Sequence, residues 1–156
     1  MGVGDVAPDW AFALGADAAT LRDGADRPLL AVSVRQGTGD VLRRPPDEDW
    51  TRRVRALADG LGVTPVVVTQ VGRDAPLGDR LAQDLRAEHL TWDGDDHAAQ
   101  EARLRDLYRR CSHVLSDWLH VAVVAATEGA VPVGLAAPTV VGDAPDKTVR
   151  TLRAAG

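Results

Sequence analysis

Short apolar runs rich in β-branched residues alternate along the chain with longer segments whose apolar residues recur every three or four positions. The short runs are typical of buried strands, and the recurring positions are typical of amphipathic helices. Strands that are separated by helices form right-handed crossovers and therefore a parallel sheet. We expect an α/β fold, a doubly wound parallel sheet of Rossmann-like type with the strand order 3-2-1-4-5. The pattern predicts strands at 29–35, 65–71, 88–92, 113–117 and 131–135.

The first two predicted helices have well-marked ends. Asp47 can accept hydrogen bonds from the first turn of the first helix, and Gly62 suits its end because glycine adopts left-handed backbone angles without strain. Leucines then recur every four residues from Leu77 to Leu85, which predicts a second amphipathic helix.

The remaining helices follow the third, fourth and fifth predicted strands. Asp95 or Asp96 can cap a third helix, whose inward positions include Tyr108 and Cys111. The segment 119–127 is apolar almost all round, so that helix should be buried on several sides. A last helix is expected near 146–153.

The domain organisation follows from length and local composition. A chain of 156 residues has room for one domain with a well-filled core. Residues 1–27 are rich in glycine, aspartate and alanine without a sustained period, and we interpret them as a lead-in or linker. Residues 28–156 carry the strand and helix pattern and form the predicted domain.

Composition and charge exclude several function classes. The net charge is −5, and no basic stripe with interleaved aromatic residues is present, so we expect no nucleic-acid partner. The longest apolar stretch is far too short to span a membrane, and the first residues lack the pattern of a signal peptide. Cys111 is the lone cysteine, so no internal disulfide can form. These features indicate a cytoplasmic protein.

Candidate ligand-binding residues follow the strands where the predicted order reverses. In open parallel sheets, ligands bind beyond the carboxyl ends of the strands at that point. Arg35 follows the first strand, and its guanidinium suits a carboxylate or phosphate. Trp118 and His120 begin the helix after the fourth strand, where unpaired N–H groups attract anions and an imidazole can transfer a proton. We expect Arg35 and His120 to face one crevice that binds a small anion.

Other polar residues are weaker candidates. Gln70 and Asp74 follow the second strand and are open to two interpretations, ligand contact or solvated loop. Lys147, the lone lysine, lies at the start of the predicted last helix and could help to bind an anion. His89 and His97 are interpreted as surface or loop residues.

Three common kinds of site are not expected. Gly37-Thr38-Gly39 lacks the third glycine of the dinucleotide fingerprint, and prolines follow where its helix should run. No nucleophile elbow is present. His113 and His120 should lie at opposite ends of one strand, so we expect no metal.

Two blocks of sequence resemble the polysaccharide pyruvyl transferase family. The signature region of that family commonly reads Ser-Asp-Arg-Leu-His and is followed by a helix. This chain is similar there, with Ser116-Asp117-Trp118-Leu119-His120, an apolar helix, and then Glu128-Gly129-Ala130-Val131-Pro132-Val133. The resemblance extends to nearly the whole chain but only to the C-terminal half of the family's two-domain, GT-B-like architecture. Further matches lie at Pro8 to Leu14, Ser33 to Arg35, Thr69-Gln70 with Asp74, and Lys147.

The resemblance implies a function and roles for residues. The family transfers a pyruvyl group from phosphoenolpyruvate, a donor substrate and not a cofactor, to sugar hydroxyls of cell-surface polysaccharide. Arg35 and His120 would hold the phosphoenolpyruvate carboxylate and phosphate with help from the backbone at Leu119, and His120 would be the general acid. The sugar acceptor would lie mainly on the other domain. A transferase would then be complete only with an N-terminal domain or a partner, such as a homo-oligomer.

One departure from the family pattern leaves alternatives open. Trp118 stands where the family commonly has arginine, and its side chain has one neutral donor and no charge. A non-catalytic or relic binding domain of the same family is therefore one alternative. The nucleotide-sugar-binding half of a GT-B glycosyltransferase is another, although Val124 stands where such enzymes often carry a glutamate.

Overall fold

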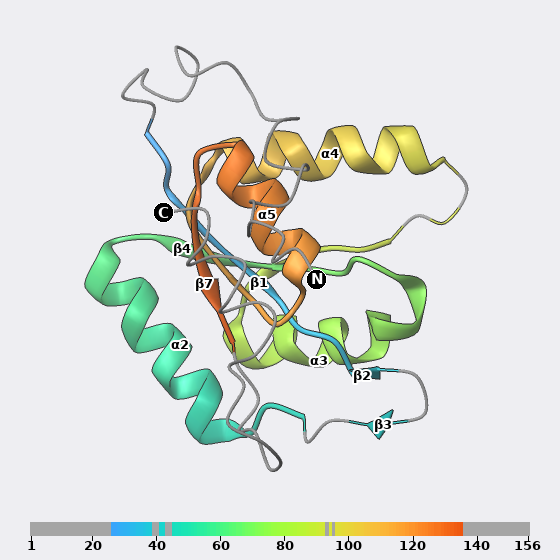
Figure 1. Ribbon diagram of the computed structural model, residues 1–156. Helices are drawn as coiled ribbons and strands as arrows, with labels where there is room; N and C mark the ends of the chain where they lie inside the picture. Colours follow the sequence, from blue (N-terminus) through green and yellow to red (C-terminus); the bar gives the residue numbers. More distant parts are fainter. Residues whose placement is uncertain (1–25, 39–40, 43–44, 93, 95, 136–156) are drawn as a thin grey trace, which may run out of the picture.

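Five parallel strands form the central sheet of the computed structural model (Figure 1). The structure describes residues 26–38, 41–42, 45–92, 94 and 96–135. The order is β5-β4-β1-β6-β7, which is 3-2-1-4-5 when these five strands are numbered along the chain. The predicted doubly wound, Rossmann-like sheet is therefore confirmed. The strands are β1 (Leu29–Ser33), β4 (Thr64–Val68), β5 (Glu88–Leu90), β6 (Cys111–Ser116) and β7 (Val131–Gly134).

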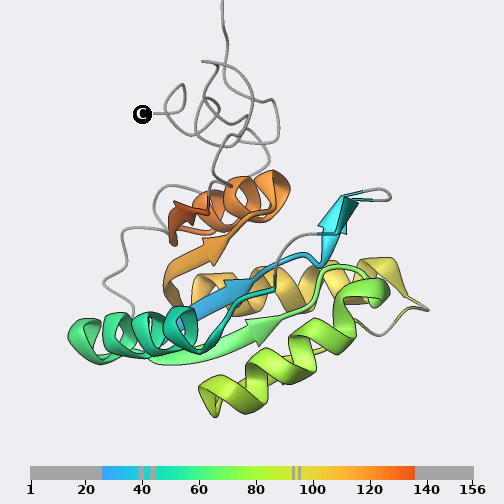
Figure 2. The ribbon, with the colours of Figure 1, turned by 90° about the horizontal axis from the view of Figure 1, so that it is seen from below.

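Helices cover both faces of the sheet. One face packs on α2 (Glu48–Leu61) and α3 (Ala75–Leu85) around Leu30, Val32 and Val67. The other face packs on α4 (His97–Arg109) and α5 (Leu119–Thr127) around Ala31 and Val114. Figure 2 shows α3 and α4 on opposite sides of β1 and β4. Because the chain changes face after β5, the strand order reverses between β1 and β6.

Helix ends agree closely with the predicted caps. The Asp47 carboxylate accepts a hydrogen bond of 3.0 Å from Trp50 N, and Gly62 ends α2 at a φ of 66°. Of the two candidates for α4, Asp96 is the cap, since its carboxylate accepts from Ala99 N at 3.0 Å. The predicted bounds of α5 are those observed.

Three features differ from the sequence prediction. Cys111 is not an inward position of α4, because α4 ends at Arg109 and Cys111 begins β6. The connection after β1 forms a short antiparallel hairpin of β2 (Gly37–Thr38) and β3 (Val41–Leu42), where only a break was expected. The short 3₁₀ helix η2 (Gly72–Asp74) precedes α3 and was not predicted either.

Parts of the predicted organisation fall on residues that the structure does not describe. The expected last helix with Lys147 and almost all of the expected lead-in lie outside the described ranges. At the described edge of that lead-in, Arg27 Nη1 donates to the carbonyl oxygens of Cys111 at 3.3 Å and Glu128 at 3.1 Å. No helix among the described residues is long and apolar enough to cross a membrane.

Candidate ligand site at the start of α5

The candidate site lies at the carboxyl ends of β1 and β6, which are neighbours in the sheet. Ser33 and Ser116 are paired at the ends of these strands, and both side chains are buried. The next residues of each strand leave the sheet at the same edge. Arg35 on one side and Asp117 and Trp118 on the other therefore meet at the reversal point of the strand order, where ligands bind in this class of fold.

Arg35 is held in place by Asp117 and Trp118. The Arg35 backbone N–H donates to Asp117 Oδ1 at 3.0 Å, and Arg35 Nε lies 3.4 Å from Asp117 Oδ2. Arg35 Cζ lies 5.3 Å from the centroid of the Trp118 ring, within the range of a cation–π contact. The Asp117 side chain is 4% exposed and that of Arg35 is 20% exposed. The guanidinium is therefore fixed but still reachable, and a buried carboxylate offsets part of its charge.

The first turn of α5 presents backbone donors next to this pair. Trp118 N donates to Ser116 Oγ at 3.0 Å, and the first bond within the helix runs from Ala122 N to Trp118 O at 3.1 Å. The N–H groups of Leu119 and His120 lie in the first helical turn, where backbone donors have no partner within the helix. The His120 side chain in this turn is exposed. Donors and an imidazole suited to an anion are therefore present here.

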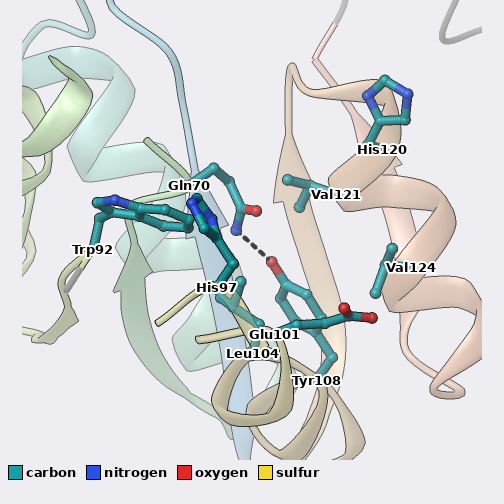
Figure 3. Close-up of a pocket in the computed structure, with 9 residues that line it drawn as sticks. All are labelled: Gln70, Trp92, His97, Glu101, Leu104, Tyr108, His120, Val121 and Val124. Atoms are coloured by element: carbon teal, nitrogen blue, oxygen red, sulfur yellow. Dashed lines mark hydrogen bonds between the residues drawn. The ribbon is translucent and has the colours of Figure 1, made fainter. Parts of the chain in front are cut away.

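A cleft of about 300 Å³ lies between α4 and α5 and reaches His120 (Figure 3). Gln70 and Tyr108 form its floor, where Gln70 Nε2 donates to the Tyr108 hydroxyl at 2.9 Å. His120 stands at the rim (Figure 3). The structure therefore brings together two predicted site residues, Gln70 and His120, while Arg35 and Trp118 are not among the residues that line this cleft. Its lining is completed by Trp92, His97, Glu101, Leu104, Val121 and Val124.

The cleft floor carries no charge. Tyr108 is 1% exposed, and its burial raises the pKa of the phenol above its ordinary value. Nearby Cys111 raises that pKa further, and the hydrogen bond from Gln70 lowers it. The phenol therefore stays protonated at neutral pH and serves as a hydrogen-bonding group rather than as a base.

Several residues of the cleft were not predicted as site residues. Trp92 follows β5 and His97 begins α4, and their rings lie 5.3 Å apart between centroids with planes tilted by 55°. Glu101, one turn further along α4, receives a hydrogen bond of 2.9 Å from Arg105 Nε. A signal for Trp92 existed, because it follows a strand at the same sheet edge as Gln70. Nothing in the sequence indicated that α4 would complete the wall.

His89 is not a surface or loop residue. It lies in β5 with a side chain 9% exposed, and its ring nitrogens contact Thr69 Oγ1 at 2.8 Å and Asp79 Oδ1 at 2.9 Å. This hydroxyl–imidazole–carboxylate order is that of a catalytic triad, but Thr69 is 2% exposed and cannot be reached by a substrate. The three residues instead connect β4, β5 and α3.

Asp74 also has a structural position. Its side chain is 2% exposed, and its Oδ1 accepts a hydrogen bond of 3.1 Å from Gln36 N. The solvated-loop interpretation is therefore wrong for Asp74, which ties η2 to the segment after β1. Within the described residues, no group of three histidine, cysteine, aspartate or glutamate side chains could hold a metal ion.

Comparisons with known proteins add little to this geometry. No protein-family model and no curated protein matches the chain. A solved structure of an uncharacterized protein from Corynebacterium glutamicum is similar, with 23% sequence identity over 71% of this chain and 86% of that chain and a TM-score of 0.45. Conclusions about function therefore depend on the site itself.

Proposed function

We propose that this chain is a phosphoenolpyruvate-binding domain resembling the C-terminal half of polysaccharide pyruvyl transferases. It would act in the cytoplasm, together with an N-terminal domain or partner chain, to transfer ketal pyruvate to sugars of cell-surface polysaccharide. One observation supports this more than any other. The Ser-Asp-Trp-Leu-His block begins α5 at the reversal point of the sheet, where Asp117 and Trp118 contact Arg35 and His120 lies in the same first helical turn.

The proposed roles follow from the chemistry of these groups. Arg35 and the N–H groups at the start of α5 suit the carboxylate and phosphate of phosphoenolpyruvate. His120 is the proposed general acid, because its exposed imidazole lies in the first turn of α5 and histidine is the most frequent proton donor in general acid catalysis. In the overall reaction, two sugar oxygens bond to C2 and the C2–O bond to phosphate breaks. One hydroxyl proton is delivered to C3 and the other leaves with inorganic phosphate.

Trp118 should make binding weak. A charge-assisted hydrogen bond contributes about 1.5–3 kcal/mol, so replacing the family's arginine by tryptophan would weaken phosphoenolpyruvate binding by about one to two orders of magnitude. In this chain the tryptophan ring instead lies beneath Arg35, which would help to orient the one guanidinium of the site. The Asp117 carboxylate lowers the net positive charge further.

Calorimetric titration of the full chain with phosphoenolpyruvate tests the proposal. We expect weak binding that is lost in Arg35→Ala and His120→Ala and is about tenfold or more tighter in Trp118→Arg. Arg52→Ala is the matched control, because Arg52 is 66% exposed on α2, on the other face of the sheet. If the folded wild type and Trp118→Arg both fail to bind phosphoenolpyruvate, the proposal is wrong.

A non-catalytic binding domain is the second candidate, and the Arg35–Asp117 ion pair favours it. This pair leaves little net positive charge for a doubly charged donor. The two candidates differ in turnover. A pyruvyl transferase should form a ketal on a pyranoside when the matching N-terminal domain is supplied, and a non-catalytic domain should bind phosphoenolpyruvate without forming product.

A further inference from the structure

We propose that the cleft between α4 and α5 is a subsite for an uncharged pyranose ring, that of the acceptor saccharide. This inference rests on the proposed function and goes further, because the resemblance alone led us to expect the acceptor mainly on the other domain. Three properties of the cleft support it: its electrostatics, the shape and chemistry of its walls, and its continuity with His120.

The charge of the cleft disfavours an anion. The Glu101 side chain lines the cleft and is 63% exposed, so a ligand in the cleft would lie close to its carboxylate. The neighbouring cation Arg105 is paired with Glu101 at 2.9 Å and with the buried Glu128 at 2.5 Å. The floor, formed by Gln70 and Tyr108, is neutral. A phosphate or carboxylate would therefore be repelled here, whereas hydroxyl groups could donate to Glu101.

The walls suit a ring that is apolar on its faces and polar around its edge. Trp92 and His97 form an aromatic side, and Val121 and Val124 form an aliphatic side across the cleft (Figure 3). The faces of a pyranose carry C–H groups that can pack on such surfaces, and its edge carries hydroxyls that the Gln70 amide can bind. A volume of about 300 Å³ is at the lower end of the range for small-ligand sites, which fits one ring.

His120 connects the cleft with the proposed anion site. It lines the cleft and also lies in the first turn of α5, directly after the residues that contact Arg35. A sugar ring in the cleft would therefore hold its hydroxyls beside the group proposed to transfer the proton. Holding both reactants next to one side chain is the arrangement that a transfer between them requires.

Saturation-transfer and amide-shift NMR titrations of the full chain test this subsite. The probes are the methyl pyranosides of glucose, galactose and mannose, with adenosine as a competing flat ring. We expect at least one pyranoside to bind and Trp92→Ala to weaken it about tenfold or more, about 1.4 kcal/mol. Trp92→Phe should retain most binding because it keeps an aromatic face. Trp50→Ala is the control, since Trp50 packs on the opposite face of the sheet.

The outcomes separate this inference from the proposed function. Pyranoside binding that depends on Trp92, with phosphoenolpyruvate affinity unchanged in the Trp92 variants, supports both. Phosphoenolpyruvate binding without any pyranoside binding overturns the subsite and leaves the proposed function standing. Pyranoside binding without phosphoenolpyruvate binding supports the ligand class and overturns the acceptor role. Adenosine binding in place of every pyranoside, or full pyranoside affinity in Trp92→Ala, overturns the subsite.

Discussion

Removing the Glu128 carboxylate should cost much of the stability of this domain. Glu128 follows α5 and is 1% exposed, yet it carries a negative charge. Its Oε1 receives a hydrogen bond from Arg105 Nη1 at 2.5 Å and its Oε2 one from Arg109 Nε at 2.8 Å. Both arginines belong to α4, so Glu128→Ala breaks the polar connection between the two helices that form the cleft.

The size of this loss in unfolding free energy depends on how deeply Glu128 and its two arginine partners are buried. Removing one partner of a buried ion pair costs about 3–5 kcal/mol when the other charge is left buried. Here the arginine side chains are 20% and 43% exposed, so water can solvate them again in the variant. We therefore expect Glu128→Ala to lower the free energy of unfolding by about 2–4 kcal/mol. Glu128→Gln should cost less, about 1–3 kcal/mol, because it keeps the shape and part of the hydrogen bonding.

Thermal denaturation followed by circular dichroism measures this effect. A loss of about 2–4 kcal/mol corresponds to a fall in Tm of about 4–16 °C in a domain of this size. Asp49→Ala is the control, because the Asp49–Arg52 pair is 65% and 66% exposed and should contribute at most about 1 kcal/mol. If Glu128→Ala melts at the same temperature as Asp49→Ala, the buried network does not stabilise the fold and the reasoning is wrong.

Three further variants or reagents test local features of the fold. A Cβ at position 78 would lie 2.5 Å from His89 Nε2, so Gly78→Ala should lower the free energy of unfolding by about 1–3 kcal/mol. This loss exceeds what alanine gains over glycine in helix propensity. Equal or higher stability of the variant in urea denaturation would contradict this. Asp47→Ala should cost about 1 kcal/mol through loss of the bond to Trp50 N, while Asp47→Asn should cost far less; equal losses in the two variants would refute the cap. Burial raises the pKa of the fully buried Cys111 thiol to about 12, so a thiol reagent at pH 8 should react only after denaturation; rapid reaction of the native protein would show that this part of the core opens.

Much of the fold could be predicted because local pattern and topology point the same way. Short apolar runs, most of them rich in β-branched residues, marked the five strands of the sheet, and the doubly wound arrangement typical of successive βα units predicted their order. The strand ends were less accurate, since the first strand was predicted to run to Arg35 whereas β1 ends at Ser33. The hairpin of β2 and β3 has two residues in each strand, too few for any alternation to show in the sequence.

The site was predicted in part, and the reason is again topological. Chain order and strand order are enough to bring Arg35, Trp118 and His120 to one sheet edge. The ion pair of Arg35 with Asp117 depends on side-chain rotamers that no periodicity specifies. The cleft depends on how closely α4 approaches α5, and so its wall residues on α4, His97 and Glu101, could not be assigned to a site from spacing alone.

The most direct test of the account is an amide-shift NMR titration of the ¹⁵N-labelled full chain with phosphoenolpyruvate, with inorganic phosphate as a parallel ligand. Our account predicts shifts that saturate at the backbone N–H groups of Arg35, Leu119 and His120, and that disappear in His120→Ala. Absence of saturable shifts at these three amides, or shifts confined to α2 on the opposite face of the sheet, would contradict it.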